Sequence, residues 1–198
     1  ILAEITRLRR FCCHPRLVFP DAELESSKVL AFLQLVEELR ENGHRALVFS
    51  QFVDFLALVR EQLDERRITY EYLDGSTPQA QRQKRVDAFQ NGSANLFLIS
   101  LKAGGFGLNL TAADYVIHLD PWWNPAVESQ ATDRAHRIGQ ERRVTVYRLI
   151  SKQTIEEQIV LLHAKKRTLA KNLLDGGASA EKLSVDELVK LIETPVTE

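Results

Sequence analysis

The sequence predicts an α/β fold in which helices cover both faces of a parallel sheet. Three strand-length runs are apolar at nearly every position: residues 46–50 (ALVFS), 96–100 (LFLIS) and 115–120 (YVIHLD). A strand that is apolar on both faces is buried on both, as in parallel sheets. Segments with helical hydrophobic spacing alternate with these runs. With 198 residues, 44% of them hydrophobic, the chain can bury a full core.

The first half of the chain begins this alternation with a well-marked helix. Ser26 and Ser27 suit its N-cap, Gly43 suits the C′ position, and residues 29–39 carry apolar side chains at helical spacing. The elements expected next are strand 46–50, an amphipathic helix through 55–63, strand 68–73 and a polar helix from Pro78 to Asn91-Gly92.

The second half continues the alternation after strand 96–100. A glycine-rich loop, AGGFGLNL (103–110), leads to strand 115–120. Asn124 suits an N-cap and Pro125 the first helical position, so a helix is expected from there to about Arg137. Strand 144–151 and a long helix over 154–175 follow, and the remaining tail carries one short amphipathic piece, VDELVKLI.

Composition excludes several classes of protein. No apolar run approaches the roughly 20 residues of a membrane span, so no membrane partner is expected. The net charge of −1 carries no overall nucleic-acid signature, so any DNA contact must be local. Cys12 and Cys13 are adjacent and badly placed to bridge each other, which indicates a reducing compartment. No second His/Cys cluster has ligand spacing, so we expect no metal site and read both cysteines as small buried hydrophobes.

The helix expected after Asn124 carries a polar stripe at the spacing of an apolar one. Its members are Gln130, Asp133, Arg134 and Arg137. An apolar face beside it consists of Val127, Ala131, Ala135 and Ile138. The stripe fits a solvated surface with an Asp133–Arg137 ion pair. It also fits two arginines that reach one polyanion from a rigid helix, as phosphoryl transfer requires.

The stretch QATDRAHRIGQ resembles motif six of the Swi/Snf-type DNA translocases of helicase superfamily two, a chromatin-remodelling type of ATPase. Five further stretches agree in order: LRRFCCHPRLV, ALVFSQF, YEYLDGST, LISLKAGGFGLNLTAADYVIHLDPWWNP and VYRLISKQTIEEQI. The resemblance covers roughly residues 1–175, and six ordered motifs do not match by chance. It implies the second RecA-like lobe of such a motor, an enzyme only as part of a full-length ATPase.

The resemblance implies ATP with Mg²⁺ as the cofactor. Arg134 and Arg137 would be arginine fingers, and Gly107, Asn109, Gln130 and Asp133 would lie toward the nucleotide. No glycine begins a phosphate loop and no D-E-x-H stretch follows an apolar strand. The first helicase lobe would therefore hold most of the ATP and Mg²⁺, and we expect this chain alone to be inactive.

Double-stranded DNA is the second partner that the resemblance implies. Three groups of residues follow strands, where ligands of open parallel sheets bind: Ser50 and Gln51; Gly75, Ser76 and Thr77; and Ser100, Lys102, Gly104 and Gly105. Asp74-Gly75 fits an ordinary tight turn as well. Of the tryptophan pair, Trp122 is expected in the core and Trp123 against DNA.

The expected organisation is a connecting helix and linker from the first lobe (1–25), the lobe (26–152), a brace helix (153–176) and a loosely held tail (177–198). The target would be a DNA-bound protein. Compact motif spacing favours a bacterial or archaeal cytoplasm or nucleoid, and a eukaryotic source would imply the nucleus. The alternatives are a non-catalytic DNA-binding or protein-interaction module that kept the fold, and a helicase that separates strands.

Overall fold

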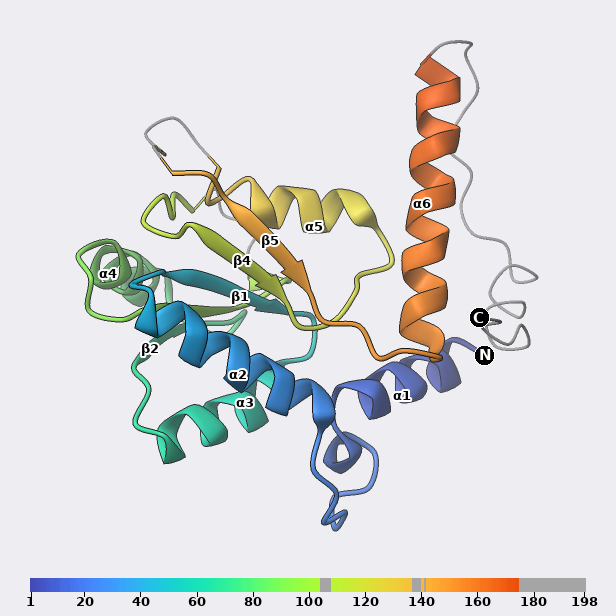
Figure 1. The fold of residues 1–198 in the computed structure, drawn as a ribbon, viewed down its shortest axis with the longest axis horizontal. Helices are drawn as coiled ribbons and strands as arrows, with labels where there is room; N and C mark the ends of the chain where they lie inside the picture. Colours follow the sequence, from blue (N-terminus) through green and yellow to red (C-terminus); the bar gives the residue numbers. More distant parts are fainter. Residues whose placement is uncertain (104–107, 137–139, 141, 175–198) are drawn as a thin grey trace.

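The computed structural model describes residues 1–103, 108–136, 140 and 142–174, with 165–174 as helix backbone. Within these residues the centre of the molecule is a five-stranded sheet in the order β2-β3-β1-β4-β5 (Figure 1). The strands are β1 Ala46–Ser50, β2 Tyr70–Leu73, β3 Leu96–Ser100, β4 Tyr115–His118 and β5 Thr145–Arg148. Every pairing between them is parallel, which confirms the predicted fold class.

Two helical layers cover the sheet. The helices are α1 Leu2–Cys13, α2 Ser27–Glu41, α3 Val53–Glu65, α4 Gln79–Gln90, α5 Pro125–Thr132 and α6 Ile155–Leu174, with a short 3-10 helix at Pro15–Leu17. Side chains of α2 and α3 pack on Val48 and Leu98, which face one side of the sheet. Side chains of α4 and α5 pack on Phe49 and Phe97, which face the other. Because successive strand residues point to opposite faces, an apolar run such as ALVFS is buried throughout.

Local capping sets the limits of α2 as the sequence predicts. The Ser26 hydroxyl accepts from the Val29 amide at 3.3 Å and donates to the Cys13 carbonyl at 2.7 Å, so one side chain caps α2 and anchors α1. Gly43 has φ +69°, a left-handed conformation that glycine adopts without steric cost. The Cys12 and Cys13 thiols are free, and burial raises the pKa of both.

α6 stands away from the sheet, with its amino-terminal end beside α1 (Figure 1). Ile155 and Ile159 of α6 pack on Ile5 of α1 in a small separate core. The tail (177–198) expected beyond this helix lies outside the described residues. None of the described helices combines the length and the apolar composition that a membrane span needs.

The helix expected to reach Arg137 is shorter than predicted, because α5 ends at Thr132 with Asp133 as its C-cap. Beyond it, the Ala135 amide donates to the Thr132 carbonyl at 3.0 Å, and the Arg134 carbonyl accepts from Leu110 of a distant loop at 3.1 Å. Local turns follow the end of the helix, and one long-range hydrogen bond joins them to Leu110.

Three predicted strands are also shorter. β2 starts at Tyr70 rather than at Ile68, whose amide caps α3 through the Leu63 carbonyl. β4 and β5 pair over four residues each, so they end at His118 and Arg148 instead of residues 120 and 151.

Candidate nucleic-acid and nucleotide site

The parallel sheet brings the predicted DNA-contacting loops to one edge. Ser50 and Ser100 are register partners at the last positions of β1 and β3, and the Leu101 amide donates to the Ser50 carbonyl at 2.9 Å. β2, which precedes the 74–77 turn, pairs with β3 in the same direction. The loops after β1, β2 and β3 therefore open at a common edge, where ligands of open parallel sheets bind.

The serines at this edge organise their loops rather than point outward. Ser50 and Ser100 are 0% and 1% exposed. The Ser50 hydroxyl donates to Asp120 Oδ1 at 2.5 Å and accepts from the Phe52 amide at 3.1 Å. The Ser100 hydroxyl accepts from the Ala103 amide at 3.3 Å. Lys102, two residues after Ser100, is exposed and is the cation among the described residues of this loop.

The turn at 74–77 is both a tight turn and an exposed loop. Asp74 Oδ1 accepts from the Ser76 amide at 2.9 Å, the Ser76 hydroxyl at 2.7 Å and the Thr77 amide at 3.1 Å. Partial burial favours the neutral acid, but hydrogen bonds from Ser76, Tyr72 and Thr77 outweigh it and lower the Asp74 pKa to about 2. Gly75 and Ser76 are exposed, whereas Thr77 is buried.

A buried arginine that the sequence analysis missed joins two of these loops. The Arg82 guanidinium donates to the Thr77 carbonyl at 2.8 Å and the Gly75 carbonyl at 3.3 Å, and it reaches the Ala103 carbonyl at 3.5 Å. The sequence did not indicate that Arg82 is buried, because Arg82 lies on a polar helix, α4, that also carries Lys84 and Arg85.

The residues predicted at the nucleotide come from two segments that a hydrogen bond joins. The hydrogen bond from Leu110 to the Arg134 carbonyl places Asn109 next to the segment that follows α5. Asn109, Gln130 and Asp133 are exposed. Gly104, Gly105 and Gly107 and Arg137 fall outside the described residues.

Arg134 differs from its predicted setting. Its side chain is 5% exposed, its guanidinium carbon lies 5.9 Å from the centre of the Phe49 ring, and its Nε is 3.5 Å from the Gln130 carbonyl. The expectation that one rigid helix carries both predicted arginine fingers is wrong, because α5 ends at Thr132, before Arg134. Arg134 is also buried, unlike Gln130 and Asp133 of the proposed stripe.

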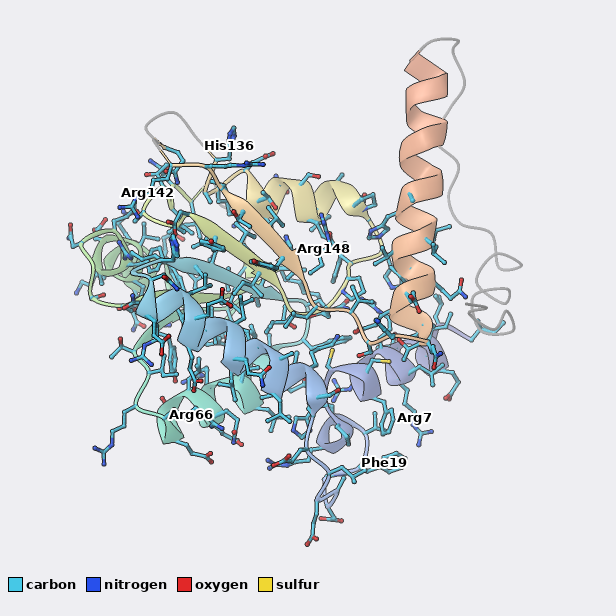
Figure 2. The ribbon with its side chains drawn as sticks, viewed as in Figure 1. Arg7, Phe19, Arg66, His136, Arg142 and Arg148 are labelled. Atoms are coloured by element: carbon cyan, nitrogen blue, oxygen red, sulfur yellow. The ribbon has the colours of Figure 1, made fainter. Side chains whose placement is uncertain are left out.

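Gln140, the last residue of QATDRAHRIGQ, holds the segment after α5 through its side-chain hydrogen bonds, a role that the sequence did not indicate. Its side-chain amide donates to the carbonyls of Thr111 at 2.9 Å, Ala113 at 2.7 Å and Ala135 at 3.2 Å. Its side-chain oxygen accepts from the Arg142 amide at 2.9 Å. Figure 2 shows His136 and Arg142 at the end of the molecule opposite α6.

The two tryptophans lie in different cores. Trp122 packs on the cluster under α4 and α5, which agrees with its predicted core position. Trp123 packs partly buried on the α1–α6 core, with the Arg9 guanidinium 5.0 Å from its ring centre. Its contact with DNA remains a prediction.

Buried charge behind the Trp122 loop was not predicted. Glu128 is 1% exposed, accepts from the Trp122 amide at 2.9 Å and pairs with Arg148 Nε at 2.6 Å. His118 lies nearby in β4, and burial lowers its pKa to about 4, so the ring is neutral at physiological pH. Among the described residues, no three His, Cys, Asp or Glu side chains form a metal-binding group.

The fold is that of a RecA-like lobe: a parallel α/β sheet with the loops predicted to face ligands at the carboxyl ends of its strands. The model of the helicase conserved C-terminal domain matches residues 27–139. The structure of the Sulfolobus solfataricus SWI2/SNF2 ATPase C-terminal domain superposes with a TM-score of 0.74 at 34% identity, covering 97% of this chain and 80% of that one. The core of that ATPase in complex with dsDNA gives a TM-score of 0.77 at 38% identity, covering 98% of this chain and 42% of that one.

Full-length proteins show the same relationship. An ATP-dependent helicase of Mycoplasma pneumoniae is 42% identical over 98% of this chain, which spans 19% of that protein. The chain therefore belongs to the helicase C-terminal domain family, and it is the C-terminal lobe of a SWI2/SNF2-type ATPase. It spans about a fifth of the length of the curated bacterial relatives it matches.

Proposed function

We propose that this chain is the second motor lobe of an ATP-dependent double-stranded DNA translocase that remodels protein–DNA complexes. The observation that carries the proposal is the common edge after β1, β2 and β3, which gathers the described members of the three groups of predicted DNA-contacting residues in a fold that superposes on a SWI2/SNF2 core solved with dsDNA. Exposed backbone and the Lys102 cation suit phosphate contacts, which are independent of base sequence.

Burial and exposure support a division of roles among the proposed DNA contacts. The Ser50 and Ser100 hydroxyls are buried and hydrogen-bonded within the protein, so we assign them the role of setting the conformation of the loops after β1 and β3. Gly75, Ser76 and Lys102 are exposed and supply the direct contacts. Because few cations take part, two or three neutralised phosphates would give log K a slope against log salt of roughly −2 to −3.

A salt titration of the chain with duplex DNA tests this part. We expect weak binding without sequence preference and a slope in that range, measured by fluorescence anisotropy on two unrelated duplexes. Tight binding that is insensitive to salt and selective for one duplex would reject these loops as phosphate contacts.

For ATP hydrolysis, we assign the transition-state contact to Arg137 and a supporting role to Arg134. Arg134 is held against Phe49 and beside the Gln130 carbonyl, which fixes the segment that leads to Arg137. The first lobe would hold ATP and Mg²⁺, and cleft closure would bring the arginine to the charge that develops on the γ-phosphate.

The decisive variant is Arg137→Ala in the full-length protein. An arginine that arrives on closure acts mainly on the transition state, so kcat should fall roughly 10³- to 10⁵-fold while ATP binding stays nearly intact. Arg137→Lys should rescue poorly because lysine lacks the planar fork of donors. The measurements are steady-state hydrolysis with saturating DNA and a nucleotide-binding titration. Near-normal kcat for Arg137→Ala would show that Arg137 is a solvated surface residue and not an arginine finger. ATPase activity in the isolated chain would contradict the proposal that the first lobe holds ATP and Mg²⁺.

We further propose that α6 braces the second lobe against the first. Its base is anchored through Ile155 and Ile159, which pack on α1, and through the buried Lys28–Glu156 ion pair, whose Nζ lies 2.5 Å from both carboxylate oxygens. From that base the helix extends beyond the body of the lobe (Figure 1). A rigidly anchored helix with a projecting end can carry movement of one lobe to another.

A further inference from the structure

Arg9 is a buried cation at the edge of the sheet, although it belongs to α1 outside the sheet's own helical layers. It is 2% exposed. Its Nη2 donates to the Pro121 carbonyl at 2.5 Å and lies 4.0 Å from Asp120 Oδ2. The guanidinium carbon is also 5.0 Å from the centre of the Trp123 ring and 5.6 Å from that of Phe52. One side chain thus contacts the loops that follow both β1 and β4.

Asp120 carries this contact to the residues predicted to face DNA. It is 1% exposed, and its Oδ1 accepts from the Ser50 hydroxyl at 2.5 Å and from the Gln51 amide at 3.3 Å. The Ser50 hydroxyl in turn accepts from the Phe52 amide, which fixes the start of α3. The path from Arg9 to the loop after β1 therefore consists of a 4.0 Å ion pair followed by hydrogen bonds, and it runs through buried groups, where electrostatic interactions are least screened.

We propose that Arg9 is a positioning residue for the DNA-facing edge: through Asp120 it sets the loop of Ser50 and Gln51, and by direct stacking it sets Trp123. The inference rests on the proposed function, because it takes these residues as the DNA side of the lobe. Arg9 itself is buried and contacts no phosphate.

The chemistry of the site requires arginine in particular. A guanidinium offers a planar face to the rings of Trp123 and Phe52 while its edge donates to Pro121 and attracts Asp120. A lysine ammonium is a compact point charge, so it can pair with Asp120 but cannot stack on the rings at the same time. Arg9→Lys therefore keeps the positive charge but removes the stacking on the two rings.

This placement also couples two parts of the molecule. Ile5, one turn before Arg9 on α1, packs on Ile155 and Ile159 of α6. A displacement of α1 and α6 relative to the sheet would move Arg9, and through Arg9 it would move the loops after β1 and β4. Arg9 and α1 thereby connect the edge proposed to contact DNA with α6, the helix proposed to brace the other lobe.

The test compares Arg9→Lys with the wild type in the full-length protein. We expect the DNA concentration that half-saturates ATPase stimulation to rise about tenfold, with a smaller change in the maximal rate. The slope of log K against log salt should stay the same, because a lost direct phosphate contact would reduce it by about one. Hydrogen exchange of peptides that cover residues 50–52 and 120–123 should become faster.

Arg7→Lys is the matched control, since Arg7 lies on the same helix with 58% of its side chain exposed and points away from the body (Figure 2). It should leave DNA half-saturation unchanged. Should Arg9→Lys fail to fold, Asp120→Asn replaces it, because Asn keeps an acceptor for Ser50 and Gln51 but leaves Arg9 without its counter-charge.

Two results would overturn the inference. An unchanged half-saturating DNA concentration with Arg9→Lys, or with Asp120→Asn in its place, would show that the network only stabilises the lobe. A reduced salt slope would show that Arg9 contacts phosphate directly. If the wild-type protein itself showed no DNA-stimulated ATPase activity, the proposed function would fail first and this inference with it.

Discussion

The Lys28–Glu156 pair offers a test of how α6 is anchored. The two side chains are 3% and 0% exposed, and the ammonium lies 2.5 Å from both carboxylate oxygens. The Ser151 amide donates to the same carboxylate at 2.9 Å. Removing one member leaves the other charge buried and unpaired, which typically costs about 3–5 kcal/mol, since solvent does not screen it. For a chain of 198 residues, about 3 kcal/mol corresponds to a loss of roughly 6–12 °C in Tm.

The assay is urea unfolding of the isolated chain, followed by circular dichroism, for Lys28→Met, Glu156→Gln and the double variant. Each single change should cost about 3–5 kcal/mol, and the double variant should cost at least about 2 kcal/mol less than their sum, because both charges are then absent. Glu61→Gln is the control: its partner Arg16 is 3.5 Å away, and both side chains are about half exposed, so the change should cost at most about 1 kcal/mol. Additive costs, or a Glu156→Gln variant as stable as the control, would refute the reasoning.

Two further predictions concern His118 and Trp123. The folded-state pKa of His118 is about 4, below its ordinary 6.5, so the unfolded chain binds more protons between those values and stability falls as pH drops through that window, by about 3 kcal/mol in total. Urea unfolding at pH 7 and pH 4.5 should show a flatter dependence for His118→Phe, and an unchanged dependence would assign the acid sensitivity elsewhere. Trp123→Ala in the full-length protein should lower translocation per ATP more than ATP turnover itself; a collapsed thermal transition would instead make the ring purely structural.

Features encoded by neighbouring residues were predictable from the sequence. The run ALVFS is apolar because α2 and α3 cover one face of β1 and α4 and α5 cover the other. Ser26 and Gly43 mark the ends of α2 by local geometry that those residue types favour. The motif order also predicted which loops would meet at one edge, since the strands are all parallel.

Features set by distant contacts were not predictable. Beyond the end of α5, the Arg134 carbonyl accepts a hydrogen bond from the amide of Leu110, which lies 24 residues earlier in the chain. The buried charges follow the same rule, because Lys28 and Glu156 are 128 residues apart and each alone resembles an ordinary surface residue. Arg134 illustrates the effect on function: its spacing suggested an exposed stripe, whereas the Phe49 ring of the central sheet covers it.

The position of α1 also has a consequence for biosynthesis. Arg9 and its acceptor Pro121 are 112 residues apart, and Ile5 is still farther along the chain from its packing partners Ile155 and Ile159. At roughly 5–20 residues per second, the ribosome needs about 6–22 s to add those 112 residues after Arg9. During that interval Arg9 and Ile5 lack these partners, so part of the native contacts of α1 forms only after β4 and α6 have been made. Until then Ile5 stays accessible to chaperones that bind exposed apolar side chains.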